Sequence, residues 1–171
     1  MVGAPGGGTV REKASHPTMG ALNAISAEAR AVLLEALMSV AWADRTLKDE
    51  EREAAQAAAL NLGLVLPPDR ALTSPDRRPV QPEQLPAEGL NTRDRELIFL
   101  CSAWMALADE VEDPAETKVL ERLQARLGID DARAGWLKGR AKDLRDRQPT
   151  GVSSWRVFDR LVVEAAKALN D

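Results

Sequence analysis

The sequence predicts an all-α fold, a small helical bundle within a single domain. Apolar residues recur at helical spacing along most of the chain, and no segment shows the alternating pattern of a β-strand. Six of the ten prolines fall in one connector, which leaves the helical segments unbroken. With 171 residues, of which 44% are hydrophobic and 29% charged, the chain is long enough to bury one core.

Residues 1–22 are predicted to be a flexible Gly-rich leader, and residues 23–171 a single helical domain. The leader holds five of the eleven glycines and no apolar core of signal-peptide length, so a cytoplasmic protein is expected. The longest apolar stretch, residues 97–108, is well short of the roughly 20 residues that a membrane-spanning helix needs. We therefore expect no insertion into a membrane.

A first helical hairpin is predicted at residues 26–64. Residues 26–43 have Ser26 as a candidate N-cap and are apolar almost all round, which is typical of a central, buried helix. Residues 49–62 are Ala-rich and end at Gly63, where a left-handed C-cap is expected. An acidic turn joins the two helices.

A Pro-rich connector follows at residues 65–92. Its prolines predict a loop or an extended chain, with one helical turn near residues 86–90. So long a stretch without regular structure is uncommon inside a compact domain. Two interpretations stay open, namely an arm that packs on the bundle and a tether.

The helical pattern then restarts. A second apolar helix is predicted at residues 94–108, and an amphipathic helix at residues 114–127 ends at Gly128. Residues 131–146 are expected to form a helix rich in Arg and Lys, and residues 154–169 a helix with one apolar face. These C-terminal helices would complete the bundle.

The chain matches itself at an offset of 65 residues, which aligns the first hairpin with the second. Repeat 1 spans about residues 26–64 and repeat 2 about residues 93–129. The identical pairs lie at the helix end, the turn and the cap: Ala41 and Ala106, Ala43 and Ala108, Asp44 and Asp109, Glu51 and Glu116, Leu62 and Leu127, Gly63 and Gly128. Two such hairpins can bury their apolar faces against each other.

The matching turns, ADRTLKDEE and ADEVEDPAE, concentrate carboxylates that a hard cation such as Ca²⁺ or Mg²⁺ would neutralise through oxygen ligands. The candidate metal ligands are Asp44, Asp49, Glu51, Asp109, Asp113 and Glu116. The spacing is not that of an EF-hand, because the required glycine is absent. Helix capping is the alternative, since Asp113-Pro114-Ala115-Glu116 also has the form of a capping box, and both interpretations stay open.

Composition excludes several classes of active site. One Cys and one His allow neither an internal disulfide nor a zinc or iron site with several Cys or His ligands. His16 lies in the Gly-rich leader, which argues against a Ser-His-Asp mechanism, and Cys101 lies mid-helix among apolar neighbours as expected of core filling. Because no phosphate loop or cofactor motif accompanies the paired carboxylates, we expect no enzymatic activity.

Residues 129–150 form the one basic segment, with six bases against four acids. Trp136 has Arg133, Lys138 and Arg140 as neighbours on the predicted helix. A solvated helix face is the simpler interpretation, and binding of an acidic partner or of nucleic acid is the alternative. Because so small a surplus falls short of a clustered basic face, nucleic acid is not the expected partner.

At the two acidic turns the sequence resembles the TerB family, which includes the DjlA N-terminal-like domains. That family is all-helical and internally duplicated, and each half carries an A-D turn, a Glu, and a Leu-Gly-Leu-like cap, matched here by residues 62–64 and 127–129. The resemblance implies a non-enzymatic adaptor or sensor in a stress-response or tellurite-resistance setting. Its partner would be a second copy of the chain or another protein, a class that includes membrane-bound proteins. A purely structural interaction or oligomerisation domain is the alternative.

Overall fold

The computed structural model describes residues 24–43, 56, 59–60, 62–64, 78, 80–107, 113–147 and 158–170. In these ranges it contains five packed α-helices and one short 3₁₀-helix, and no strand, which confirms the predicted all-α class. The elements are α2 (Ala27–Ala41), η2 (Pro82–Gln84), α4 (Thr92–Ala106), α5 (Pro114–Leu127), α6 (Asp131–Asp146) and α7 (Phe158–Ala168).

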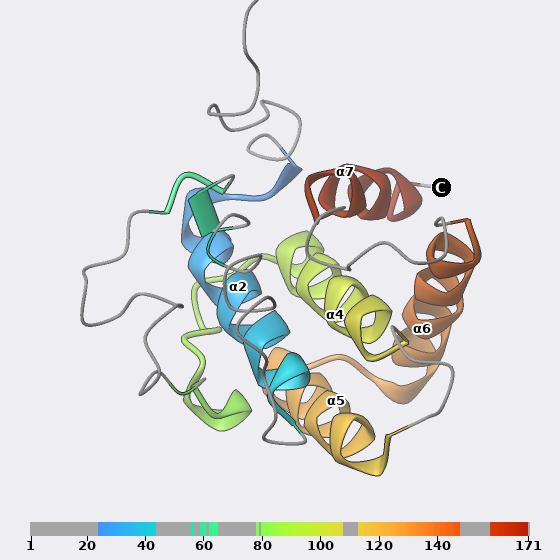
Figure 1. Ribbon diagram of the computed structural model, residues 1–171, viewed down its shortest axis with the longest axis horizontal. Helices are drawn as coiled ribbons and strands as arrows, with labels where there is room; N and C mark the ends of the chain where they lie inside the picture. Colours follow the sequence, from blue (N-terminus) through green and yellow to red (C-terminus); the bar gives the residue numbers. More distant parts are fainter. Residues whose placement is uncertain are drawn as a thin grey trace, which may run out of the picture.

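Helix α4 lies at the centre of the bundle. It packs against α2, α5, α6 and α7, which surround it in Figure 1. Every side chain from Leu97 to Met105 is buried, so the helix has no solvent-facing stripe along this stretch. This agrees with its sequence, which is apolar almost all round.

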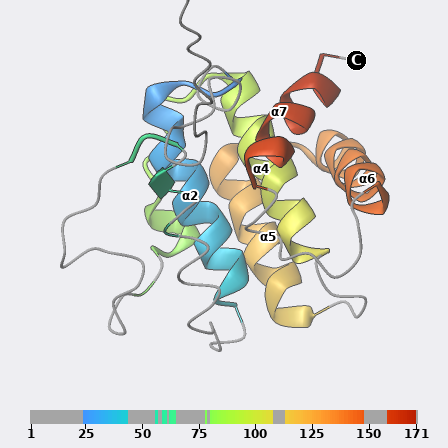
Figure 2. The ribbon, with the colours of Figure 1, turned by 45° about the horizontal axis from the view of Figure 1, so that its top comes forward.

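Helices α2 and α4 run in the same direction, side by side, in both ribbon views (Figures 1 and 2). Polar contacts join their N-terminal ends: the Ser26 hydroxyl donates to the buried carboxylate of Asp94, and Arg93 donates to the Ala24 carbonyl at 3.1 Å. Ser26 is the N-cap of α2, as predicted, but its side chain does not cap the helix. The hydroxyl is instead used to satisfy Asp94, whose burial requires a partner.

Capping side chains stand at the N-termini of α4, α5 and α6. Helix α4 begins at Thr92, two residues before the predicted start, because Asn91 accepts a hydrogen bond from the Asp94 amide at 2.8 Å. Helices α5 and α6 have the predicted bounds. Gly63 and Gly128 have φ values of 73° and 68°, which confirms the left-handed conformation expected at both positions.

Part of the Pro-rich connector packs on the bundle. We call residues 80–90 the strap, and four of its side chains are buried: Pro82, Leu85, Ala87 and Leu90. The sequence predicted one helical turn near residues 86–90, but the short helix of the strap is the 3₁₀-helix at Pro82–Gln84. At 86–90 the structure has only a turn, in which the Leu90 amide donates to the Ala87 carbonyl. Proline at the first helical position favours the observed site.

Some predicted segments fall outside the residues that the structure describes. These include the leader, most of residues 49–62 and the first residues of the predicted helix at 154–169. Within residues 49–62, Gln56, Ala59 and Leu60 are helical, and Ala59 and Leu62 are buried. In the described ranges, no helix is both long enough and apolar enough to cross a bilayer.

Candidate functional site

The two acidic turns are only partly visible. Asp44, Asp49, Glu51 and Asp109 lie outside the described residues, while Asp113 and Glu116 stand at the start of α5. The part of the chain that the structure describes holds no group of three or more His, Cys, Asp or Glu side chains arranged to bind a metal ion. The proposed convergence of both turns on one cation therefore stays a prediction.

Asp113 acts as a helix cap. Its Oδ1 accepts a hydrogen bond from the Ala115 amide at 2.9 Å, and its carbonyl accepts one from the Thr117 amide at 3.1 Å. Proline follows at the first helical position, and Glu116 lies half-buried in the first turn. Both carboxylates are well placed for the positive end of the α5 dipole.

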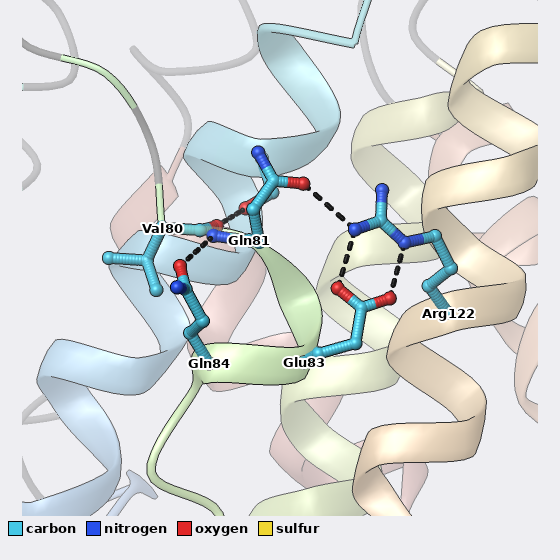
Figure 3. A network of polar contacts seen from close by, with 6 residues as sticks. Val80, Gln81, Glu83, Gln84 and Arg122 are labelled. Atoms are coloured by element: carbon cyan, nitrogen blue, oxygen red, sulfur yellow. Dashed lines mark hydrogen bonds and ion pairs between the residues drawn. The ribbon is translucent and has the colours of Figure 1, made fainter.

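Figure 3 shows a network of polar contacts that ties the strap to α5. The Arg122 guanidinium approaches both carboxylate oxygens of Glu83, and it also donates to Gln81 Oε1 at 2.8 Å. A two-pronged Arg–carboxylate contact fixes orientation as well as distance. Sequence reasoning left this pair out, although Glu83 lies in the connector and Arg122 on the polar face of α5.

Two further arginines hold the rest of the strap. One turn along α5, Arg126 donates to the Leu85 carbonyl at 2.8 Å and to Glu88 Oε1 at 2.6 Å. From α4, Arg95 donates to the carbonyls of Leu90, Ala87 and Leu127, at 2.9, 2.7 and 3.2 Å. The strap is thus recognised through its backbone as well as its acidic side chains.

The strap also contacts α2 at its first residue. The Ser39 hydroxyl donates to the Val80 carbonyl at 2.7 Å, and Glu35 Oε2 accepts from the Val80 amide at 3.4 Å. Residue 80 is therefore held by α2, residues 83–88 by α5, and residues 87–90 by α4. This surface of the bundle thus binds a peptide segment of the same chain, the strap.

The pairing leads to a prediction about pH. Hydrogen bonding to Arg122 lowers the pKa of Glu83 from 4.5 to about 2. Since the folded-state pKa is the lower one, the stabilisation is fully present above pH 4.5 and is lost as the pH falls through about 2. We expect Glu83→Gln to lower the urea midpoint at pH 6, and this difference from the parent protein to shrink towards zero near pH 2.

Glu121→Gln is the matched control for that experiment. Glu121 is an exposed carboxylate on α5 that forms no ion pair with any described residue. Its substitution should leave the urea midpoint close to that of the parent at both pH values. A Glu83→Gln effect of equal size at pH 6 and near pH 2 would contradict the assigned ion pair.

Helix α6 carries the basic segment. Arg133 makes a two-pronged contact with Glu96 of α4 at 2.8 and 2.7 Å, and its guanidinium lies 4.2 Å from the centre of the Trp136 ring. Arg140 lies 5.0 Å from the same ring centre. Trp136 is half-buried, packs against the edge of the core and lies within cation–π distance of both arginines. The ring orders both guanidinium groups through cation–π attraction.

Cys101 fills the core, as predicted. The side chain is completely buried in α4, and burial raises the pKa of its thiol well above the usual range. Because the thiolate is the reactive form, the native state offers a poor nucleophile at this position.

No protein-family model, curated protein or solved structure matched this chain.

Proposed function

We propose that this chain is a duplicated, TerB-like helical module that acts as a non-enzymatic adaptor or sensor. In this proposal it works in the cytoplasm and meets another protein, including a membrane-bound one, or a second copy of itself. The two acidic turns would hold a divalent cation, Ca²⁺ or Mg²⁺, through Asp44, Glu51, Asp109 and Glu116, with Asp49 and Asp113 as helpers.

The observation that carries this proposal is a shared register. Adding 65 to the N-cap and the bounds of α2 gives those of α4: Ser26 becomes Asn91, and Ala27–Ala41 becomes Thr92–Ala106. Both helices have 15 residues. The sequence identities at the same offset lie mostly outside these helices, so the helix bounds support a duplication independently of them.

The caps after the second helix of each hairpin support the same offset. The Gly63 amide donates to the Leu60 carbonyl and the Leu64 amide to the Ala59 carbonyl. The same pattern recurs 65 residues later, where the Gly128 amide donates to Ala125 and the Ile129 amide to Gln124. Both are Schellman-type caps around a left-handed glycine.

The placement of the helix ends supports a shared site for the two turns. Because α2 and α4 run in the same direction, the chain leaves both helices at the same end of the bundle, where α5 also begins (Figures 1 and 2). The first turn follows α2 and the second follows α4. Carboxylates from both turns would therefore enter the same region of the molecule.

The structural alternative draws on a different observation. Asp113 already uses Oδ1 to cap α5, which is the role expected if the acidic turns only cap helices. The chain would then be an interaction or oligomerisation domain without a cation. The two hypotheses predict different results: a divalent ion raises the free energy of unfolding if the turns bind it and leaves it unchanged if they only cap helices.

Thermal unfolding of the full chain with EDTA, then with excess Ca²⁺ or Mg²⁺, tests the proposal. An ion at about a hundredfold over its Kd stabilises by about 2.7 kcal/mol. This should raise Tm by roughly 5–10 °C for a chain of this size. Asp109→Asn with Glu116→Gln should abolish the shift, because it removes one candidate ligand at each end of the second turn.

A double variant with the same change of charge serves as the control. Glu28→Gln with Glu121→Gln removes two exposed carboxylates outside both turns and should keep the ion-dependent shift. No shift with either ion, or an equal loss in both double variants, would contradict the cation site and leave the acidic turns as helix caps.

A further inference from the structure

A charged groove lies between the C-terminal halves of α6 and α7. It has a volume of about 410 Å³, within the range of small-ligand and peptide-anchor sites. Helix α6 contributes Arg140 and Asp143, its C-cap contributes Arg147, and α7 contributes Glu164 and Lys167. Among the described residues, neither the strap nor Asp113 and Glu116 at the start of α5 line this groove, and it shares Arg140 with the α6 cluster described above.

The positive charges in the groove are only partly neutralised. Lys167 pairs with Glu164 at 3.5 Å. Within the described ranges, Arg140 and Arg147 form no ion pair, and Asp143 is the remaining acid of the lining. Among the described lining residues, two arginines therefore stand against one carboxylate that forms no ion pair.

The position of Arg140 is not explained by the α6 dipole. Arg147 is the C-cap of α6, where a cation offsets the negative end of the helix. Arg140 lies seven residues earlier, beyond the last turn over which this effect acts. Its described contact is with the Trp136 ring, whose centre lies 5.0 Å from the central guanidinium carbon. Cation–π attraction restrains a guanidinium without pairing it to an anion, so its N–H donors stay available for a carboxylate or phosphate.

A second arginine also contacts the Trp136 ring. Arg133, paired with Glu96 at 2.7 Å, lies 4.2 Å from the ring centre. The series Glu96, Arg133, Trp136 and Arg140 links α4 to the groove. A preordered arginine loses less conformational freedom when it binds an anion.

We propose that the α6–α7 groove binds an acidic, extended segment of a partner protein. Arg140 and Arg147 are two helical turns apart, about 10 Å along the axis. Two acidic residues three positions apart in a polyproline-like peptide are separated by about 9 Å and lie on the same side. Asp143 lies between the two arginines in the sequence. Its carboxylate accepts a hydrogen bond from a donor group of the peptide and disfavours peptides with a continuous run of acidic residues.

A labelled peptide with two glutamates separated by two prolines is the probe. Fluorescence anisotropy of this peptide is measured against the full chain at low salt, since such contacts weaken with ionic strength. We expect saturable binding, and none for the peptide in which both glutamates are glutamine. Arg140→Gln with Arg147→Gln should weaken binding at least tenfold.

The control variant is Lys138→Gln with Lys142→Gln, which removes two charges from the same helix. Both lysines are exposed and neither lines the groove. This variant should keep the affinity within threefold, and circular dichroism should show that both double variants remain helical. Equal losses in the two variants, or no binding to the parent chain, would overturn the proposal.

A single-stranded oligonucleotide with the same number of charges distinguishes the source of the anion. Tighter binding of the oligonucleotide than of the peptide, with the same dependence on Arg140 and Arg147, would overturn the assignment to an acidic protein segment.

Trp136→Leu adds a test of positioning, because it leaves the charge of the groove unchanged. It should weaken peptide binding several-fold, and unchanged binding would contradict the role given to the ring.

Discussion

Replacement of Phe99 by alanine is expected to lower the free energy of unfolding by about 3–5 kcal/mol. Phe99 is completely buried in α4, the helix that contacts all the others around it. Removing its ring loses apolar burial and leaves a cavity that the neighbouring helices cannot fully close. Such a loss is a large part of the usual 5–15 kcal/mol stability of a domain. Urea and thermal unfolding should show it, with Tm lower by roughly 6–20 °C.

Leu107→Ala provides the comparison for Phe99→Ala. Leu107 is the C-cap of the same helix and is 39% exposed. Its truncation should change stability by no more than about 0.5 kcal/mol, as expected of a surface position. Losses of similar size in the two variants would mean that α4 is not the central helix of the folded state.

The second large effect is expected for Arg95→Ala, at about 2–3 kcal/mol. The Arg95 guanidinium donates to the carbonyls of Ala87, Leu90 and Leu127 and thereby links the strap to the C-terminal end of α5. Alanine would leave these acceptors without their charged donor. Arg95→Lys should recover only part of the loss, because an ammonium group cannot reproduce the fixed fork of donors.

Arg93→Ala is the matched control, two residues away on α4. Arg93 is exposed and donates to a single described carbonyl, that of Ala24. Its removal should cost less than about 1 kcal/mol. Hydrogen exchange adds a local measurement, since only Arg95→Ala should increase exchange in the strap. Equal effects of the two variants on stability and exchange would contradict the linking role of Arg95.

Local signals in the sequence determined much of the fold. The bounds of α5 and α6 follow directly from an aspartate N-cap at each start and, for α5, from Gly128 at the end. Helix α4 starts two residues before its predicted position because the apolar pattern begins after its polar first turn. The Asn91 side chain, rather than hydrophobic periodicity, marks that start.

The contacts of the strap were beyond sequence reasoning for a different reason. Arg122 and Glu83 are 39 positions apart, so no local propensity reports their meeting. The sequence did show two arginines one turn apart on α5, Arg122 and Arg126, and several acids in the connector, Glu83 and Glu88 among them. These residues can be paired only once α5 and the strap have been placed against each other. For the acidic turns, sequence reasoning predicted the Asp113 cap, and the cation site stays a prediction.

The burial of Cys101 makes the rate of its chemical labelling a measure of how often the bundle opens. The chain has one cysteine, and its thiol is sealed in the helix around which the others pack. A thiol reagent can reach it only in molecules where α4 has come free of its neighbours. The rate at which the native protein is labelled therefore reports how often the whole bundle opens, and fraying of the helix ends contributes nothing to that rate.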